Sequence, residues 1–181
     1  MEVVMNKNKS YFIVLAGLFV ALGIVFPFVT GGIPVIGQKL LPMHIPVLLC
    51  GFVCGPVYGA LAGVLTPILR SMLFGAPVMV PMAVSMAFEL AAYGFFSGFL
   101  YKKVGKIYIA LVGAMLGGRV ILGIINIFLY SSMETAYSWQ LFLAGAFFNA
   151  IPGIIIQLVL VPILVVTLKK ARVIEECEQK I

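Results

Sequence analysis

The stretch 42–75, PMHIPVLLCGFVCGPVYGALAGVLTPILRSMLFG, decides the fold expected for this chain. It is mostly apolar over 34 residues, whereas a helix crosses the hydrocarbon of a membrane with about 20 residues. The stretch is therefore too long for one crossing and slightly short for two. The Gly55-Pro56 pair divides it, because proline cannot continue a helix but is favoured where one begins. We expect two short helices here, over 44–54 and 57–73.

Further apolar runs lie on both sides of this stretch. They predict four more helices, over 11–29, 82–101, 107–129 and 141–168. The first run is longer than the apolar core of a typical signal peptide, so we expect it to remain as a membrane helix. The expected fold class is all-α integral membrane: a single membrane domain over 1–181, built as a six-transmembrane-helix bundle, with a charged tail over 169–181.

The composition excludes an ordinary water-soluble domain. The chain is 63% hydrophobic and 10% charged, against about 45–50% and 25% in soluble domains. Too few polar side chains are present to cover a water-exposed surface, so lipid is the expected solvent. The three cysteines, Cys50, Cys54 and Cys177, have no histidine cluster near them in the sequence. We therefore expect no metal and no cofactor.

The positive charges are unevenly distributed along the chain. Six crossings place both termini on one side of the membrane, together with the connection between the fourth and fifth helices. Cytoplasmic segments carry an excess of Lys and Arg, so we expect cytoplasmic N and C termini, a multi-pass protein of a bacterial plasma membrane, and no nucleic-acid partner despite the net charge of +6. Nine of the twelve cations lie in these segments: Lys7, Lys9, Lys102, Lys103, Lys106, Lys169, Lys170, Arg172 and Lys180.

A few polar residues interrupt the apolar helices and mark the candidate site. A charged group at the bilayer centre costs about 2.5–3.5 kcal/mol on insertion scales, and such residues are usually functional. Helical spacing puts Glu89 and Tyr93 on one face, and depth counting places most of the polar set in the outer half of the bilayer. We expect a cavity open to the outside that binds a small, partly polar solute through Arg70, Met86, Glu89, Tyr93, Arg119, Asn126, Asn149 and Gln157.

Other interpretations of these residues remain open. Glu89 and Arg119 could form a structural ion pair that joins two helices, or Glu89 could serve a proton or ion pathway. If Arg70 faces the cavity, the site carries one surplus positive charge, which favours a carboxylate-bearing solute. A histidine at the start of a helix, such as His44, is more often satisfied by backbone or water than by a ligand.

Several catalytic motifs are missing from the sequence. It contains no GxxxxGK(S/T) phosphate-binding loop, no HExxH and no GxSxG. We therefore expect a transport protein without an ATPase site of its own and not an enzyme. The energy for moving the solute would come from a gradient or from a partner.

The chain resembles a known transporter family over nearly its whole length. The resemblance is carried by the pair Gly17-xxx-Ala21, by HIPV at 44–47 leading into GPVYGA at 55–60, and by the lysine-rich connection after the fourth helix. With six helices and both ends cytoplasmic, these features are similar to the substrate-binding S component of energy-coupling factor (ECF) vitamin transporters.

The resemblance implies a function and a set of partners. Gly17 and Ala21 would dock a transmembrane coupling subunit, which works with two ATPase subunits while the S component topples in the membrane. The solute would be a small vitamin or vitamin precursor, bound near the outer face in a region that matches the polar set above. A carboxylate-bearing compound such as pantothenate is favoured, with riboflavin or a pyridoxine-like compound open. The alternatives are a self-sufficient secondary transporter or channel using Glu89 and Arg119, and an accessory protein with structural polar pairs.

Overall fold

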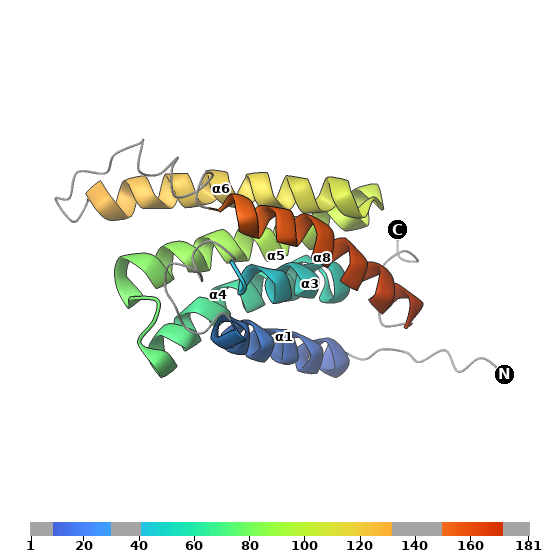
Figure 1. Cartoon of the computed structure of the whole chain (residues 1–181), viewed down its shortest axis with the longest axis horizontal. Helices are drawn as coiled ribbons and strands as arrows, with labels where there is room; N and C mark the ends of the chain where they lie inside the picture. The colour runs from blue at the N-terminus through green and yellow to red at the C-terminus, as the bar shows by residue number, and fades with distance from the viewer. Residues whose placement is uncertain (1–8, 30–40, 132–149, 172–181) are drawn as a thin grey trace.

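A computed structural model describes residues 9–29, 41–131 and 150–171 of the chain. This described part forms α-helices and one short π-helical turn, and it contains no strand. The elements are α1 (Lys9–Val29), α3 (His44–Cys54), α4 (Pro56–Phe74), η1 (Met79–Ala83), α5 (Val84–Val104), α6 (Ile107–Ser131) and α8 (Ile151–Lys170), arranged as in Figure 1.

The all-helical fold expected from the sequence is confirmed, with six α-helices among the described residues. Five of them are long and apolar enough to cross a membrane, and α3 is a shorter apolar helix. The stretch 42–75 thus forms one short helix and one of spanning length, because α4 reaches 19 residues. The helix expected over 141–168 is observed as α8 from Ile151 onward, and residues 141–149 lie outside the described part.

Helix α3 lies in the interior of the bundle. All 11 of its residues are buried, and it packs against α1, α4, α5 and α8. At 1.5 Å per residue it is about 16 Å long, roughly half the hydrocarbon thickness. Its first residue therefore lies inside the bundle and not at its end.

Glycines allow α3, α4 and α5 to approach one another at backbone distance. A Cβ added to Gly94 would meet the carbonyl oxygen of Gly59, and one added to Gly98 would lie 2.6 Å from the carbonyl oxygen of Gly51. Small residues of this kind permit close helix contact in lipid, where helices gain little from the hydrophobic effect. Between α3 and α4, Gly55 adopts a positive φ of 91°, which reverses the chain direction before Pro56.

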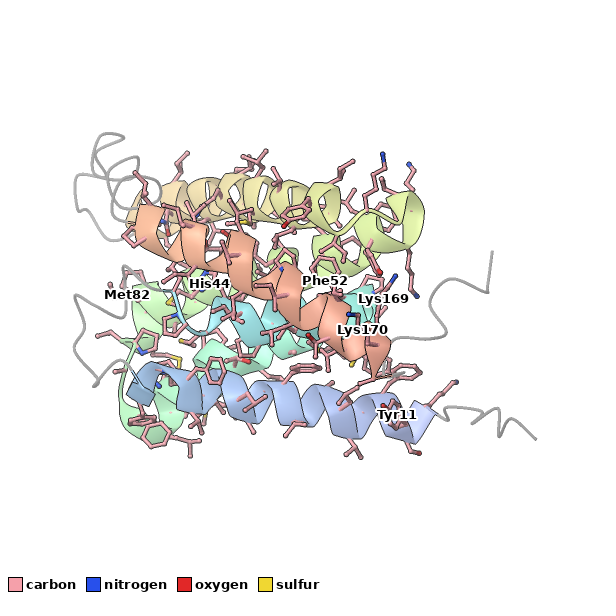
Figure 2. The ribbon with its side chains drawn as sticks, turned by 45° about the vertical axis from the view of Figure 1, so that its right-hand side comes forward. Tyr11, His44, Phe52, Met82, Lys169 and Lys170 are labelled. Atoms are coloured by element: carbon pink, nitrogen blue, oxygen red, sulfur yellow. The ribbon has the colours of Figure 1, made fainter. Side chains whose placement is uncertain are left out.

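The helices run up and down, so the bundle has two chemically different ends. Figure 2 shows Tyr11, Lys169 and Lys170 at one end and His44 and Met82 toward the other. Lys169 Nζ lies 5.1 Å from the ring centre of Tyr101, which joins the ends of α8 and α5. We call this the lysine end; its described cations are Lys9, Lys102, Lys103, Lys106, Lys169 and Lys170.

We predict that Gly94→Ala destabilises the bundle, because the added methyl group has to displace the backbone of α4. Overpacking of this kind costs about 1–3 kcal/mol. The measurement is the thermal unfolding midpoint of the purified protein in detergent. Gly17→Ala is the matched control, since nothing lies within 4 Å of a Cβ at Gly17. Equal midpoints for the two variants would show that α4 and α5 do not meet at Gly59 and Gly94.

Candidate functional site

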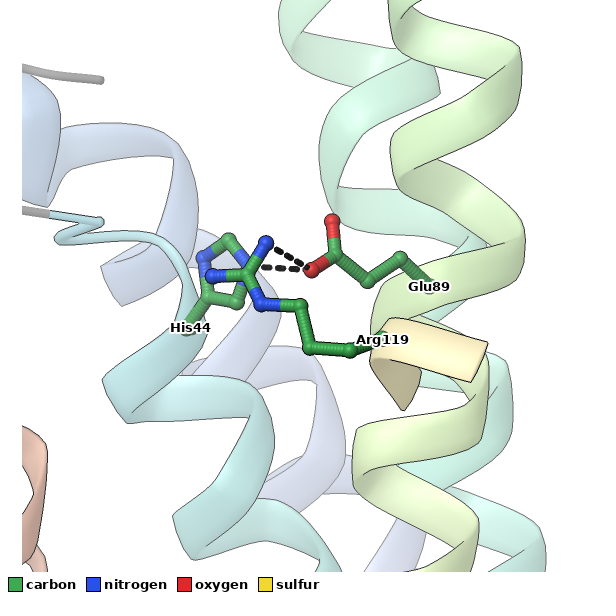
Figure 3. A network of polar contacts seen from close by, with 3 residues as sticks. All are labelled: His44, Glu89 and Arg119. Carbon is green, nitrogen blue, oxygen red and sulfur yellow. Dashed lines mark ion pairs between the residues drawn. The ribbon is translucent and has the colours of Figure 1, made fainter. Parts of the chain in front are cut away.

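The centre of the candidate site is the carboxylate of Glu89 on α5. Arg119 Nη1 from α6 lies 2.8 Å from Glu89 Oε1, and His44 Nε2 from α3 lies 3.6 Å from the same oxygen (Figure 3). All three side chains are buried, with exposed fractions of 0–7%. We call these three residues the Glu89 cluster. It joins three helices that are far apart in the sequence.

Two local features of the fold bring these residues together. A Cβ at Gly118 would lie 2.9 Å from the ring of Tyr93, so α6 passes very close to α5 just before Arg119. Helix α3 is so short that His44, its first residue, lies beside Glu89 in the interior. The sequence analysis did not include His44 among the binding residues. The signal that could have identified it is the 11-residue length of the helix it begins.

Tyr93 and Gln157 are two further buried polar residues of the predicted set. Tyr93 follows Glu89 by one helical turn of α5. Its ring meets the His44 ring edge-on, with 5.1 Å between the ring centres. Gln157 on α8 is fully buried. Lys169 of α8 contacts Tyr101 of α5 at the lysine end. Gln157 lies twelve residues before Lys169, and Glu89 lies twelve residues before Tyr101. At 1.5 Å per residue, Gln157 and Glu89 are therefore both about 18 Å from the lysine end.

Several polar atoms at this depth have no hydrogen-bond partner among the described residues. They are both ring nitrogens of His44, Glu89 Oε1, Arg119 Nη2, and the amide oxygen and nitrogen of Gln157. Arg119 approaches Glu89 through Nη1 alone, so the second arm of its guanidinium is left over. Buried polar groups are nearly always hydrogen-bonded, because leaving one unpaired costs about 1–3 kcal/mol. The arrangement can therefore donate to and accept from a bound solute.

Met86 and Asn126 lie nearer the end opposite the lysines. Ser85 Oγ donates to Asn126 Oδ1 at 2.7 Å and lies 2.9 Å from the Pro81 carbonyl oxygen, so α5 and α6 are joined a second time, one turn from Glu89. Met86 and Asn126 are half-buried. Asn149, also predicted to bind the solute, lies outside the described residues.

Arg70 is held by a different part of the protein from the Glu89 cluster. Its Nη1 donates to the Ile24 carbonyl oxygen at 2.8 Å, and its guanidinium lies 5.1 Å from the ring centre of Phe28. These contacts tie α4 to α1. Among the described residues no ion pair links Arg70 to Glu89, whose carboxylate pairs with the Arg119 guanidinium.

A bundle of apolar helices around a buried group of hydrogen-bonding side chains is typical of a membrane protein that binds a solute. The family model for the substrate-specific component of ECF transporters matches residues 11–165, and the chain belongs to this family. This confirms the resemblance drawn from the sequence. Members of the family are substrate-binding transport subunits and not ATPases, and they act with coupling and ATPase subunits. No curated protein and no solved structure matches the chain.

We predict that Arg119→Met destabilises the protein more than the double variant Glu89→Gln/Arg119→Met. The single change leaves the Glu89 carboxylate buried without its partner, which costs about 3–5 kcal/mol, whereas the double change removes both charges. The measurement is a double-mutant cycle of unfolding free energies, with Glu89→Gln as the other single variant. Additive effects of the two single changes would contradict the ion pair.

Proposed function

We propose that this chain is the substrate-binding subunit of an ECF-type ABC importer. It captures a small vitamin or vitamin precursor from outside and delivers it with a coupling subunit and two ATPase subunits. The observation that supports this is the Glu89 cluster, in which buried polar atoms of three helices have hydrogen-bonding capacity to spare. A purely structural ion pair would not need His44 and Gln157 with unpartnered nitrogens and oxygens at the same depth.

The lysine end faces the cytoplasm in this proposal, in a bacterial plasma membrane. The distribution of cations supports this orientation, because Lys and Arg accumulate on the cytoplasmic side of membrane proteins. Glu89 is then about 8 Å from the outer start of α5 at Val84 and about 22 Å from its cytoplasmic end at Val104. The site is thus closer to the outside, where the solute enters.

The binding site in this proposal is the Glu89 cluster with Tyr93 and Gln157 around it. Met86 and Asn126 complete it toward the outer face, and Asn149 stays a predicted binding residue. Pantothenate, riboflavin and pyridoxine-like compounds each offer several hydrogen-bonding groups that could pair with these side chains.

The coupling subunit docks on α1. Gly17 and Ala21 are both exposed on this helix, and a Cβ at Gly17 would meet nothing within 4 Å. Small residues on an apolar helix face let a partner helix approach closely in lipid. The neighbouring apolar side chains on α1 are 53–72% exposed: Ile13, Val14, Leu18 and Val25.

We predict that the chain purified alone binds one vitamin with a submicromolar dissociation constant. Native mass spectrometry of the freshly purified protein, followed by titration with the compound it carries, provides the measurement. The double variant Glu89→Gln/Arg119→Met should weaken binding at least tenfold, because the donors of Arg119 are lost. Thr167→Val, on the exposed face of α8, is the control, and this variant should bind the vitamin with the affinity of the original chain.

Two results would contradict this function. One is a folded protein that neither carries nor binds any small metabolite. The other is uptake into liposomes by the chain alone, driven by a proton gradient without ATPases, which would identify a secondary transporter.

We predict that Gly17→Leu and Ala21→Leu abolish co-purification with the coupling subunit and the ATPases. The leucine side chains add bulk to the exposed face of α1 and not to the Glu89 cluster, so vitamin affinity should not change. Val120→Phe is the control, since it adds bulk to an exposed position of α6. A complex that forms equally well with all variants would place the docking surface elsewhere.

A further inference from the structure

We propose that the solute is held through an uncharged group that carries a hydrogen-bond donor and an acceptor side by side, and that Gln157 recognises this group. Primary amides, lactams, imides and ureides have this property. The inference rests on the proposed function and specifies the chemistry of the same site. It replaces the carboxylate expected from the sequence.

The charge balance of the site provides the first argument. Arg119 is paired with Glu89 at 2.8 Å, and Arg70 is engaged with the Ile24 carbonyl and the Phe28 ring. A solute carboxylate would therefore bring a second anion to one guanidinium in a poorly solvated interior. An unpaired charge is costly in such surroundings, and two carboxylates close together also repel each other. An uncharged group avoids this cost.

The unpartnered atoms provide the second argument. Gln157 offers one acceptor and one donor from the same planar amide, and neither has a partner among the described residues. A carboxylate can only accept hydrogen bonds, so it would leave Gln157 Oε1 unsatisfied. A group that presents N–H next to C=O satisfies both atoms of the Gln157 amide at once. It can also accept from Arg119 Nη2, which has no acceptor in the described part of the chain.

The packing of α8 brings Gln157 to the same side of the bundle as the helices of the Glu89 cluster. Helix α8 contacts both α3 and α6, the helices that carry His44 and Arg119. Gln157 and Glu89 both lie about 18 Å from the lysine end, where Lys169 contacts Tyr101. The Gln157 amide thus faces the interior of the bundle at the depth of the Glu89 cluster.

The test uses pairs of compounds that differ in one group. Panthenol and pantothenate share an amide, and only pantothenate carries a carboxylate. Nicotinamide and nicotinate exchange an amide for a carboxylate, and 3-methylriboflavin lacks the imide N–H of riboflavin. Affinities for the full-length chain in detergent are measured by native mass spectrometry, for the original chain, for Gln157→Leu and for the control Thr167→Val.

In the pair that binds, we expect the compound with the carboxylate to bind no more tightly than its uncharged counterpart. Loss of the amide or imide edge should weaken binding about 10- to 100-fold. Gln157→Leu should weaken the same compound by a similar factor, and Thr167→Val should not. If Gln157→Leu does not fold, Gln157→Met keeps the length of the side chain and gives the same comparison.

The inference is overturned if the carboxylate member of a pair binds more than tenfold tighter than its uncharged counterpart, or if Gln157 variants bind unchanged. In either case solute binding itself would stand, and with it the proposed function. If none of the six compounds binds and the folded protein carries no metabolite, the proposed function fails first.

Discussion

Neutralising one carboxylate inside an apolar bundle is the constraint on which the rest of this structure depends. Glu89 lies in α5 with 3% of its surface exposed, where an unpaired charge would be very costly. The protein meets this constraint by bringing Arg119 and His44 to a single carboxylate oxygen. Three helices are thereby fixed in register at one depth. Arg119 contacts Glu89 through Nη1 only. Its Nη2 has no partner among the described residues and can donate to a solute.

Close backbone packing is what makes that convergence possible. Glycines at the contacts of α3, α4 and α5 let three helices lie closer than larger side chains would permit. In the middle of them α3 spans only part of the bundle, so its first residue is an interior residue. His44 at this position is fully buried and lies 3.6 Å from Glu89 Oε1 through its Nε2. The short helix and the glycine contacts therefore have a direct consequence for the chemistry of the site.

The interior and the surface of the bundle serve different parts of the proposed function. The interior is rich in hydrogen-bonding atoms, whereas α1 carries exposed apolar side chains on its outer face. Arg70 links the two regions mechanically, since it connects the end of α4 to the backbone of α1. Arg70, which the sequence predicts as a binding residue, thus makes its described contacts with α1.

Much of this architecture follows from the sequence alone. The lengths of apolar runs fix the helices, since hydrocarbon thickness sets the number of residues per crossing. The spacing of Glu89 and Tyr93 fixes their common face, and the rarity of buried charge marks Glu89 and Arg119 as partners worth considering. Helical periodicity contains no information about which residues of different helices meet. Only the tertiary structure decided that His44 joins the cluster and that Arg70 does not, because those outcomes depend on how deeply α3 begins and on which helix lies beside α4.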